Sequence, residues 1–243
     1  MSLPIVILGA GPAGLAAAEA ASADGQPVLL VDENPEAGGQ IWRGGPSRWH
    51  DQRAEKLWKA LLARPHVKVL CGARVVAAAA PGTLLLETDA GARSVAWERV
   101  ILCTGARELL LPFPGWTLPG VTGAGGMQAL IKGGMPVAGK RVVVAGSGPL
   151  LLAVADTVRR NGGKVVAIAE QRVSAQLARF GARLALRHHA KFMQALHLMV
   201  ALRSIPYLRG ALVTAAQGED QLASVTLEQG GSTRTIACDF LAC

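Results

Sequence analysis

The sequence is poor in cysteine, in aromatic residues and in charge. Its four cysteines form no CxxC pair and stand in or beside apolar runs, which excludes a redox dithiol and argues against a zinc site. Aromatic residues make up only 4% of the chain and no block of Lys and Arg is present, so the stacking platforms of nucleic-acid binders are missing. With 51% hydrophobic and 17% charged residues, the composition is typical of a globular protein. The cysteines are Cys71, Cys103, Cys238 and Cys243.

Long apolar runs are also missing. No uncharged run reaches the roughly 18 residues that a membrane helix needs, and the longest candidate, residues 142–155, is interrupted by GSGP. The N-terminal stretch MSLPIVILGAG lacks a basic segment and leads directly into a strand, unlike a signal peptide. We therefore expect a cytoplasmic protein without a transmembrane segment. The formal net charge of +8 favours anionic cofactors or an acidic partner subunit over nucleic acid.

What the chain does contain is one pattern that occurs twice. Residues 4–33 read as strand, glycine turn, helix, turn and strand, and residues 140–170 repeat the same order. Two strand–helix–strand units of nucleotide-binding type are therefore the organising feature of the chain. The matched positions are Gly9 with Gly146, Gly11 with Gly148, and Asp32 with Glu170.

The segments around the repeats have less specific patterns. An amphipathic helix is expected over residues 51–63, followed by four strand-like runs. Residues 108–140 are rich in Gly and Pro and indicate a crossing segment with one short helix. Residues 174–204 look helical and basic, and we interpret them as a solvated or partner-facing surface. No catalytic or metal role is expected for the histidines of this segment, which are His188, His189 and His197.

The first repeat carries Gly-x-Gly-x-x-Gly directly after a strand and at the opening of a helix. The first glycine makes a tight turn, the second lets a pyrophosphate approach the backbone, and the third allows close packing of helix and strand. The helix N-terminus offers N–H groups and partial positive charge to phosphates. At the end of the second strand, Asp32 or alternatively Glu33 can bind a ribose, which favours FAD or NAD over NADP. The candidate residues of the loop are Gly9, Gly11, Pro12, Ala13 and Gly14.

The second repeat keeps Gly146 and Gly148 but has Leu151 at the third glycine position. A leucine there is expected to push the helix away or tilt it, so this turn is intact as a fold and doubtful as a site. Glu170 keeps the position of the ribose-binding carboxylate, with Arg172 nearby. NAD or another adenine nucleotide therefore remains a candidate ligand of the second site.

Longer phrases carry a resemblance to a known family. With DENPEAGGQIWRGG, RVILCTGARELLLPFPGW and GSGPLLLAVA, the chain resembles the pyridine nucleotide–disulfide oxidoreductases. Within them it is most similar to the α-type subunits of hydrogen cyanide synthase, opine oxidase and proline or hydroxyproline dehydrogenase complexes, and to the related part of heterotetrameric sarcosine oxidase. The resemblance implies an α/β fold of two Rossmann-like dinucleotide-binding units (glutathione-reductase-like), the second inserted in the first. The implied parts are a FAD-binding domain over 1–110, a crossing segment over 111–139 and a second, NAD-type domain over 140–243.

The resemblance also implies further flavin contacts. In the family, the segment after the ribose carboxylate runs close to the flavin, and here its two glycines would permit backbone contact while the Gln40 amide offers a donor and an acceptor. A strand end of ATG type approaches FAD, and another strand position meets the adenine. The residues that match these three places are Gly39 and Gln40, then Thr104 and Gly105, then Arg74 and Val75.

The function implied is that of one component of an oxidoreductase complex. Without a dithiol, a flavin must pass its electrons to a second flavin, an iron–sulfur centre or a carrier. We therefore expect an FAD-dependent dehydrogenase of a small-molecule amine or amino acid, of opine, proline or hydroxyproline type. It would work in a hetero-oligomer with an iron–sulfur protein and an amino-acid oxidase-like flavoprotein subunit. The alternatives are a stand-alone NADH-dependent FAD reductase and a non-catalytic nucleotide-binding scaffold subunit.

No residue of the sequence stands out as catalytic, and no metal-ligand set is expected.

Two segments of the family pattern have no match in this sequence, and both would follow its last strand. The final strand-like stretch, CDFLAC, leads in relatives to a GD turn beside the FAD phosphates and then to a cysteine-rich iron–sulfur segment. On the resemblance, the chain is expected to be C-terminally truncated, and its flavin pocket to lack one wall.

Overall fold

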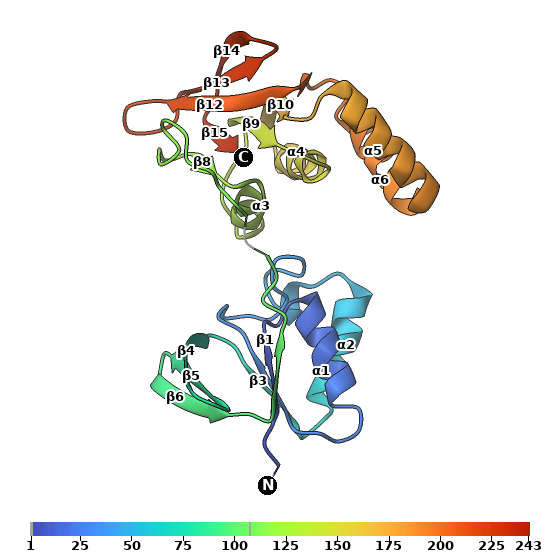
Figure 1. Cartoon of the computed structure of the whole chain (residues 1–243), viewed down its shortest axis with the longest axis vertical. Coiled ribbons are helices and arrows are strands. Elements are labelled where there is room, and N and C mark those ends of the chain that lie inside the picture. Colours follow the sequence, from blue (N-terminus) through green and yellow to red (C-terminus); the bar gives the residue numbers. More distant parts are fainter. Residues whose placement is uncertain (1, 107) are drawn as a thin grey trace. The chain divides into compact units, whose positions relative to one another are not determined.

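The chain forms two compact units, Met1–Arg107 (unit 1) and Glu108–Cys243 (unit 2). A computed structural model describes residues 2–106 and 108–243 (Figure 1). Each unit has a parallel sheet with helices on one face and a three-stranded antiparallel sheet on the other. The predicted α/β class with parallel sheets is confirmed.

Unit 1 is built on a four-stranded parallel sheet of order β3-β2-β1-β7. Its strands are β1 (Ile5–Leu8), β2 (Val28–Val31), β3 (Val67–Leu70) and β7 (Arg99–Leu102). Its helices are α1 (Pro12–Ala21) and α2 (Gln52–Leu62), with a short 3₁₀ turn η1 (Pro46–Arg48). The antiparallel sheet is inserted between β3 and β7 and consists of β4 (Arg74–Ala80), β5 (Thr83–Thr88) and β6 (Gly91–Ala96).

The central strands of unit 1 are buried on both faces. Ile7 and Leu30 pack with α1 and α2, whereas their chain neighbours Val6 and Leu29 pack against the antiparallel sheet. Two-sided burial explains why these strands read as unbroken apolar runs instead of alternating ones. It also leaves the carboxyl ends of the parallel strands as the part of the sheet where polar residues are tolerated.

Unit 2 repeats this architecture with additions. Its parallel sheet has the order β11-β10-β9-β15-β8, and its antiparallel sheet β12-β13-β14 lies in sequence between β11 and β15. The strands are β8 (Val121–Thr122), β9 (Arg141–Gly146), β10 (Lys164–Glu170), β11 (Tyr207–Arg209), β12 (Ala211–Gln217), β13 (Ser224–Gln229), β14 (Ser232–Ala237) and β15 (Phe240–Ala242). The helices are α3 (Ala124–Lys132), α4 (Leu150–Arg160), α5 (Ser174–Arg187) and α6 (His189–Ala201).

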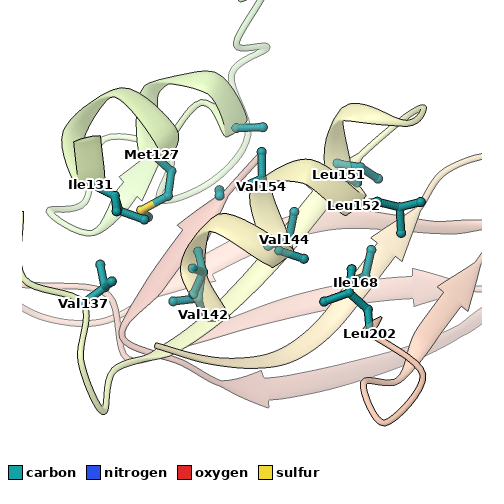
Figure 2. Close-up of a cluster of buried hydrophobic side chains, with 14 residues drawn as sticks. Met127, Ile131, Val137, Val142, Val144, Leu151, Leu152, Val154, Ile168 and Leu202 are labelled. Atoms are coloured by element: carbon teal, nitrogen blue, oxygen red, sulfur yellow. The ribbon is translucent and has the colours of Figure 1, made fainter. Parts of the chain in front are cut away.

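The core of unit 2 lies between its parallel sheet and the helices α3 and α4 (Figure 2). Val144 of β9 and Ile168 of β10 meet Leu151 and Val154 of α4, and all four side chains are buried. The opposite face of the sheet packs on the antiparallel sheet, where Val225 and Leu227 are buried. The repeat seen in the sequence thus extends from the glycine turns to the whole layered architecture.

One local expectation needs correction, and a second gains detail. The fourth of the strand-like runs expected after residues 51–63, SVAWERVILCTGA, contains two strands, not one. The Trp97 N–H bonds to the Gly82 carbonyl at the antiparallel sheet, while the next N–H, of Glu98, bonds to the Pro4 carbonyl beside β1. The basic helical stretch is two helices, because His188 leaves the helical conformation (φ −143°, ψ 62°). Both breaks depend on tertiary contacts or on a single backbone conformation, which hydrophobic periodicity does not report.

Candidate functional site

The glycine loop of unit 1 connects β1 to α1 and is fixed by backbone hydrogen bonds on both sides. The Gly9 N–H donates to the Val31 carbonyl at 2.7 Å, and the Gly38 N–H donates to the Ala10 carbonyl at 2.8 Å. Helix α1 begins at Pro12, and its first i→i−4 bond runs from the Leu15 N–H to the Gly11 carbonyl. Proline suits this first helical position because its missing N–H would have no partner within the helix.

Asp32 directly follows β2 and holds this loop through its side chain. One carboxylate oxygen accepts from the Ala10 N–H at 2.5 Å, and the other accepts from the Asn34 N–H and from the Asn34 side-chain amide, both at 2.8 Å. The side chain is buried, with a residue exposure of 6%. A carboxylate has about four acceptor positions, so these bonds leave capacity for a ribose hydroxyl. In this structure Asp32 is first a tether that binds the strand end to the glycine loop.

The three glycines of this loop differ in what restricts a side chain at their positions. Gly9 has φ +103°, and a Cβ there would lie 2.3 Å from the Cys103 carbonyl oxygen. A Cβ at Gly14 would lie 1.7 Å from the Gly9 carbonyl oxygen, so the close approach of α1 to the loop requires glycine. Gly11 differs, because its φ is −75° and a Cβ there would meet only the Gly39 Cα, at an ordinary contact distance of 3.8 Å. The fold of the chain therefore does not explain why residue 11 is glycine.

Several other candidate positions of unit 1 gather at this loop. The main chain of Cys103 and Thr104 lies beside Gly9, and Gly39 faces Gly11. The Ala73 N–H donates to the Asp32 carbonyl at 2.9 Å, which anchors the start of β4, where Arg74 and Val75 follow. Segments that are far apart in sequence thus meet at the carboxyl ends of parallel strands, where α/β proteins bind ligands.

Other predicted side chains point elsewhere or are engaged with neighbours. Glu33 is exposed, and it is Asp32 that contacts the loop. The Gln40 side chain accepts from Arg43 at 2.9 Å, and Arg74 forms an exposed ion pair with Glu87 at 2.9 Å. Of the two carboxylates considered for the ribose, the structure therefore favours Asp32 by position.

A cavity of about 360 Å³ lies at the end of β3, next to this site. It is lined by residues 70–72 and by the β5–β6 turn, residues 88–93. Cys71 is in its wall, and burial, with the nearby charges of Asp32 and Glu36, raises the pKa of this thiol. The wall therefore presents a protonated, unreactive thiol at neutral pH.

The other cysteines have the same character. Cys238 is buried, while Cys71, Cys103 and Cys243 are half-buried, and all four are free thiols. Burial raises the pKa of Cys238 and of Cys243 to about 11, and it also raises the pKa of Cys103. Of the four cysteines, Cys238 alone is fully buried.

The glycine loop of unit 2 is held by a similar tether, which binds the loop one residue further along than in unit 1. Glu170 is completely buried and accepts from the Gly148 N–H at 2.9 Å and from the Arg172 N–H at 3.0 Å. The second bond reproduces the one between Asp32 and the N–H two residues later in unit 1. The hydroxyl of Tyr207 also donates to Glu170, at 3.5 Å, and Arg172 Nε donates to Ser147 at 3.2 Å. Strand register pairs Glu170 with Gly146, so the tether stands at the same place in both repeats.

The second loop, which has Leu151 in place of the third glycine, differs from the first loop in backbone conformation. The Leu151 side chain is 2% exposed and packs in the core of unit 2 (Figure 2). A Cβ added to Gly146 would lie 3.4 Å from the Leu151 Cδ2. The Leu151 N–H donates to the Gly148 carbonyl at 3.3 Å, a tighter i→i−3 bond than the first bond of α1. Gly148 has φ +100°, whereas its counterpart Gly11 has φ −75°. In unit 2, backbone conformation alone accounts for the second glycine.

The sequence reasoning missed the backbone partners at these loops. Ala10, Asn34 and Ala73 all hydrogen-bond to Asp32 and so form the frame of the first site. Their side chains are unremarkable in the sequence except for Asn34, which stands two residues after the carboxylate in a position that favours a local turn. The other contacts come from backbone groups, which carry no residue-type signal.

Within the described residues, no helix is both long and apolar enough to span a bilayer. The same part of the chain, residues 2–106 and 108–243, contains no cluster of three His, Cys, Asp or Glu side chains suited to a metal ion.

Comparison with known proteins places this geometry in a family context. Residues 3–242 match the family described as pyridine nucleotide-disulphide oxidoreductase. Hydrogen cyanide synthase subunit HcnB of Pseudomonas protegens is 35% identical over 241 residues, which covers 93% of this chain and 51% of that protein. An opine oxidase subunit of Agrobacterium tumefaciens is 39% identical over 170 residues, or 62% of this chain and 33% of that protein. The chain thus spans about half or less of the length of these relatives.

Solved structures agree on the fold. The crystal structure of thioredoxin reductase from T. acidophilum has a TM-score of 0.70 to this chain and covers 99% of it, and 76% of that chain is matched. The sequence identity is 22%, so this likeness is one of fold.

The tether in unit 1 predicts a stability effect. Replacing Asp32→Ala leaves the Ala10 and Asn34 N–H groups without their acceptor, which should lower the free energy of unfolding by about 1–3 kcal/mol. Urea denaturation in the absence of nucleotide measures this free energy of unfolding. The neighbouring control Glu33→Ala removes an exposed carboxylate and should change stability by no more than about 0.5 kcal/mol. Equal stability of the two variants would contradict the tether.

The tether in unit 2 predicts an unusual tyrosine titration. Burial, together with the adjacent Glu170 carboxylate, raises the pKa of Tyr207 to about 12. Tyr207 is the only tyrosine of the chain, so phenolate absorbance reports it alone. At pH 11 roughly a tenth of it should be ionised in the folded protein, against about nine tenths for an ordinary tyrosine. Because the folded-state pKa is raised, this group contributes stability below pH 10 that is lost as the pH rises through 12.

Replacing Glu170→Gln provides the control for this titration. Removal of the charge should move the pKa of Tyr207 downward without restoring it to 10, because burial is the larger cause. Native protein that titrates near pH 10, like the urea-unfolded chain, would show that Tyr207 is not packed against Glu170.

Proposed function

Because the chain belongs to the pyridine nucleotide-disulphide oxidoreductase family, we propose that unit 1 binds FAD through its glycine loop. We further propose that the chain is a subunit of an FAD-dependent dehydrogenase acting on a small-molecule amine or amino acid. The domain functions follow from this proposal, with the flavin nucleotide on the N-terminal unit and a second nucleotide-type fold in the C-terminal unit.

One observation carries the first part of the proposal, and it is the unexplained glycine at position 11. Gly9 and Gly14 are required by the chain's own backbone, but Gly11 has an ordinary φ and room for a side chain. A ligand that lies against the Gly11 backbone would account for the missing side chain, as a diphosphate does in dinucleotide sites. The fit of the residues to FAD therefore rests on space that the protein itself leaves beside Gly11 and Gly39.

The donors and acceptors around this space suit a dinucleotide. The Ala10 N–H is already taken by Asp32, so the first-turn N–H groups of Ala13 and Gly14 are left to face a diphosphate, with the positive end of α1 behind them. Asp32 is held in place by its own hydrogen bonds and presents its remaining lone pairs for a ribose. Fixing the carboxylate beforehand lowers the entropic cost of binding.

The proposed chemistry follows from the cofactor, and the proposed partner subunits follow from the related proteins. When bound, FAD supplies a ring that can take up a hydride from a C–H bond next to nitrogen. The relatives named above are subunits of a hydrogen cyanide synthase and of an opine oxidase, which supports a role in a heteromeric oxidoreductase of amino-acid-like substrates. We propose an amino-acid oxidase-like flavoprotein and an iron–sulfur protein as its partners.

The alternative of a stand-alone NADH-dependent reductase requires a working nucleotide site in unit 2. The second loop lacks the feature that supports the first, because the positive φ of Gly148 already explains its glycine. The third glycine position holds Leu151, whose side chain is buried in the core of unit 2. The geometry therefore favours a nucleotide site in unit 1 over one in unit 2.

Substitution of Gly11 tests the proposal. The variant Gly11→Val should fold normally, since a Cβ at this position meets only the Gly39 Cα, at 3.8 Å, yet it should lose FAD because the new methyl groups occupy the space of the diphosphate. We expect bound FAD per chain to fall at least about ten-fold, because the valine side chain adds bulk where the diphosphate would contact the loop backbone. Absorbance near 450 nm after incubation with FAD and gel filtration measures it.

The matched control is Gly181→Val, which adds the same bulk to α5 at a position with no atom within 4 Å. It should retain the FAD content of the unmodified chain. The proposal fails if Gly11→Val, with unchanged circular dichroism and melting temperature, also retains that content.

A further inference from the structure

The helices α5 and α6 form a hairpin that has no counterpart in unit 1. Unit 1 has the single helix α2 between its second and third strands, whereas unit 2 has two helices at this place (Figure 1). Helix α6 packs on α4, but α5 packs chiefly on α6, and neither α5 nor α6 contains a fully buried residue. The outer helix α5 therefore adds little to the core of its own unit.

The hairpin lies in a long segment without a single acidic residue. From Gln171 to Gly218 there is no Asp or Glu, although the chain has 17 of them elsewhere. Helix α5 carries arginines four residues apart, which places them along one side of the helix. The basic residues of the segment are Arg172, Arg179, Arg183, Arg187, Lys191, Arg203 and Arg209.

Helix α6 is apolar on two sides. The partly buried Phe192 and Leu198 lie on its inner side. Met193, Leu196 and Val200 follow at i, i+3 and i+7, and form a second stripe with exposures of 47%, 43% and 57%. Exposed apolar side chains are common singly, but a stripe at helical spacing beside a basic helix is typical of a binding surface.

We propose that the α5–α6 hairpin docks onto an acidic, partly apolar face of another protein subunit. The inference rests on the proposed function, because one component of a heteromeric dehydrogenase needs such a surface. Charge complementarity carries it, since a segment with seven basic and no acidic residues selects a partner of opposite charge.

The residue types favour a protein partner over an anionic membrane. Six of the seven basic residues are arginine and the exposed stripe contains methionine, and these types are enriched at protein interfaces where lysine is depleted. An interfacial membrane helix often carries tryptophan on its apolar face, and α5 and α6 contain none.

The test uses the tagged full-length chain, isolated from the cells that encode it. A carbodiimide couples amines to carboxylates in direct contact, and Lys191 is the only lysine of the hairpin. We expect Lys191 to be coupled to an Asp or Glu of a second polypeptide, within a peptide rich in acidic residues. The triple reversal Arg179→Glu, Arg183→Glu and Arg187→Glu should reduce this product, and the co-purified partner, at least ten-fold.

A control reverses the same charge elsewhere. Lys56→Glu, Lys68→Glu and Arg234→Glu change three exposed residues outside the hairpin and should leave the coupling within two-fold of the unmodified chain. Equal losses in both triple variants would contradict a specific site. Coupling of Lys191 only to the same chain or to a second copy of it, or no coupling at all, would overturn the inference. The inference would also be overturned if the unmodified chain co-sedimented with vesicles containing 30% phosphatidylserine and the triple reversal in the hairpin abolished this binding.

FAD content measured on the same samples separates this inference from the proposed function. A chain that couples to an acidic partner but releases no FAD on denaturation contradicts the proposed function alone. A chain that releases FAD but gives no intersubunit product at Lys191 contradicts the docking surface alone.

Discussion

The structure depends on a carboxylate at the end of the second strand of each unit, which holds the glycine loop after the first strand. Asp32 and Glu170 are both buried, stand at the same register and accept backbone N–H groups of their loops. A buried carboxylate is tolerated only where such donors satisfy it, so strand, loop and side chain stabilise one another. The helix that follows each loop is oriented by this arrangement.

The same tether supports two different loops, and the difference lies in the third glycine position. Gly14 lets α1 approach the Gly9 carbonyl, so the loop of unit 1 needs no positive φ at its second glycine. Leu151 takes part in the core instead, and the loop of unit 2 places Gly148 at φ +100°. Neither backbone conformation nor crowding therefore requires the glycine at position 11 of the first loop, whereas the positive φ of Gly148 accounts for the glycine of the second. This contrast is the physical basis of our proposal that the flavin nucleotide binds to unit 1.

The two repeats of the fold could be predicted from the residue pattern, whereas the hydrogen bonds that hold the loops could not. The strand–glycine–helix pattern predicted both repeats because two-sided burial makes short apolar runs and the turns demand glycine. The role of Leu151 could be anticipated because its bulk is incompatible with the close packing of Gly14. The tethering bonds of Asp32 could not, since their partners are backbone groups of Ala10 and Asn34. The ligand contacts of the candidate residues remain predictions, and the structure contributes their proximity.

The most direct measurement of the central claim is hydrogen exchange of the full chain with and without FAD. The account predicts that FAD slows exchange in the peptide that spans residues 9–15 and leaves the peptide that spans residues 146–152 unchanged. Both loops are held by their carboxylates, so the expected difference comes from ligand contact, which the account assigns to the first loop alone. Protection confined to residues 146–152, or no protection in either loop at saturating FAD, would contradict it.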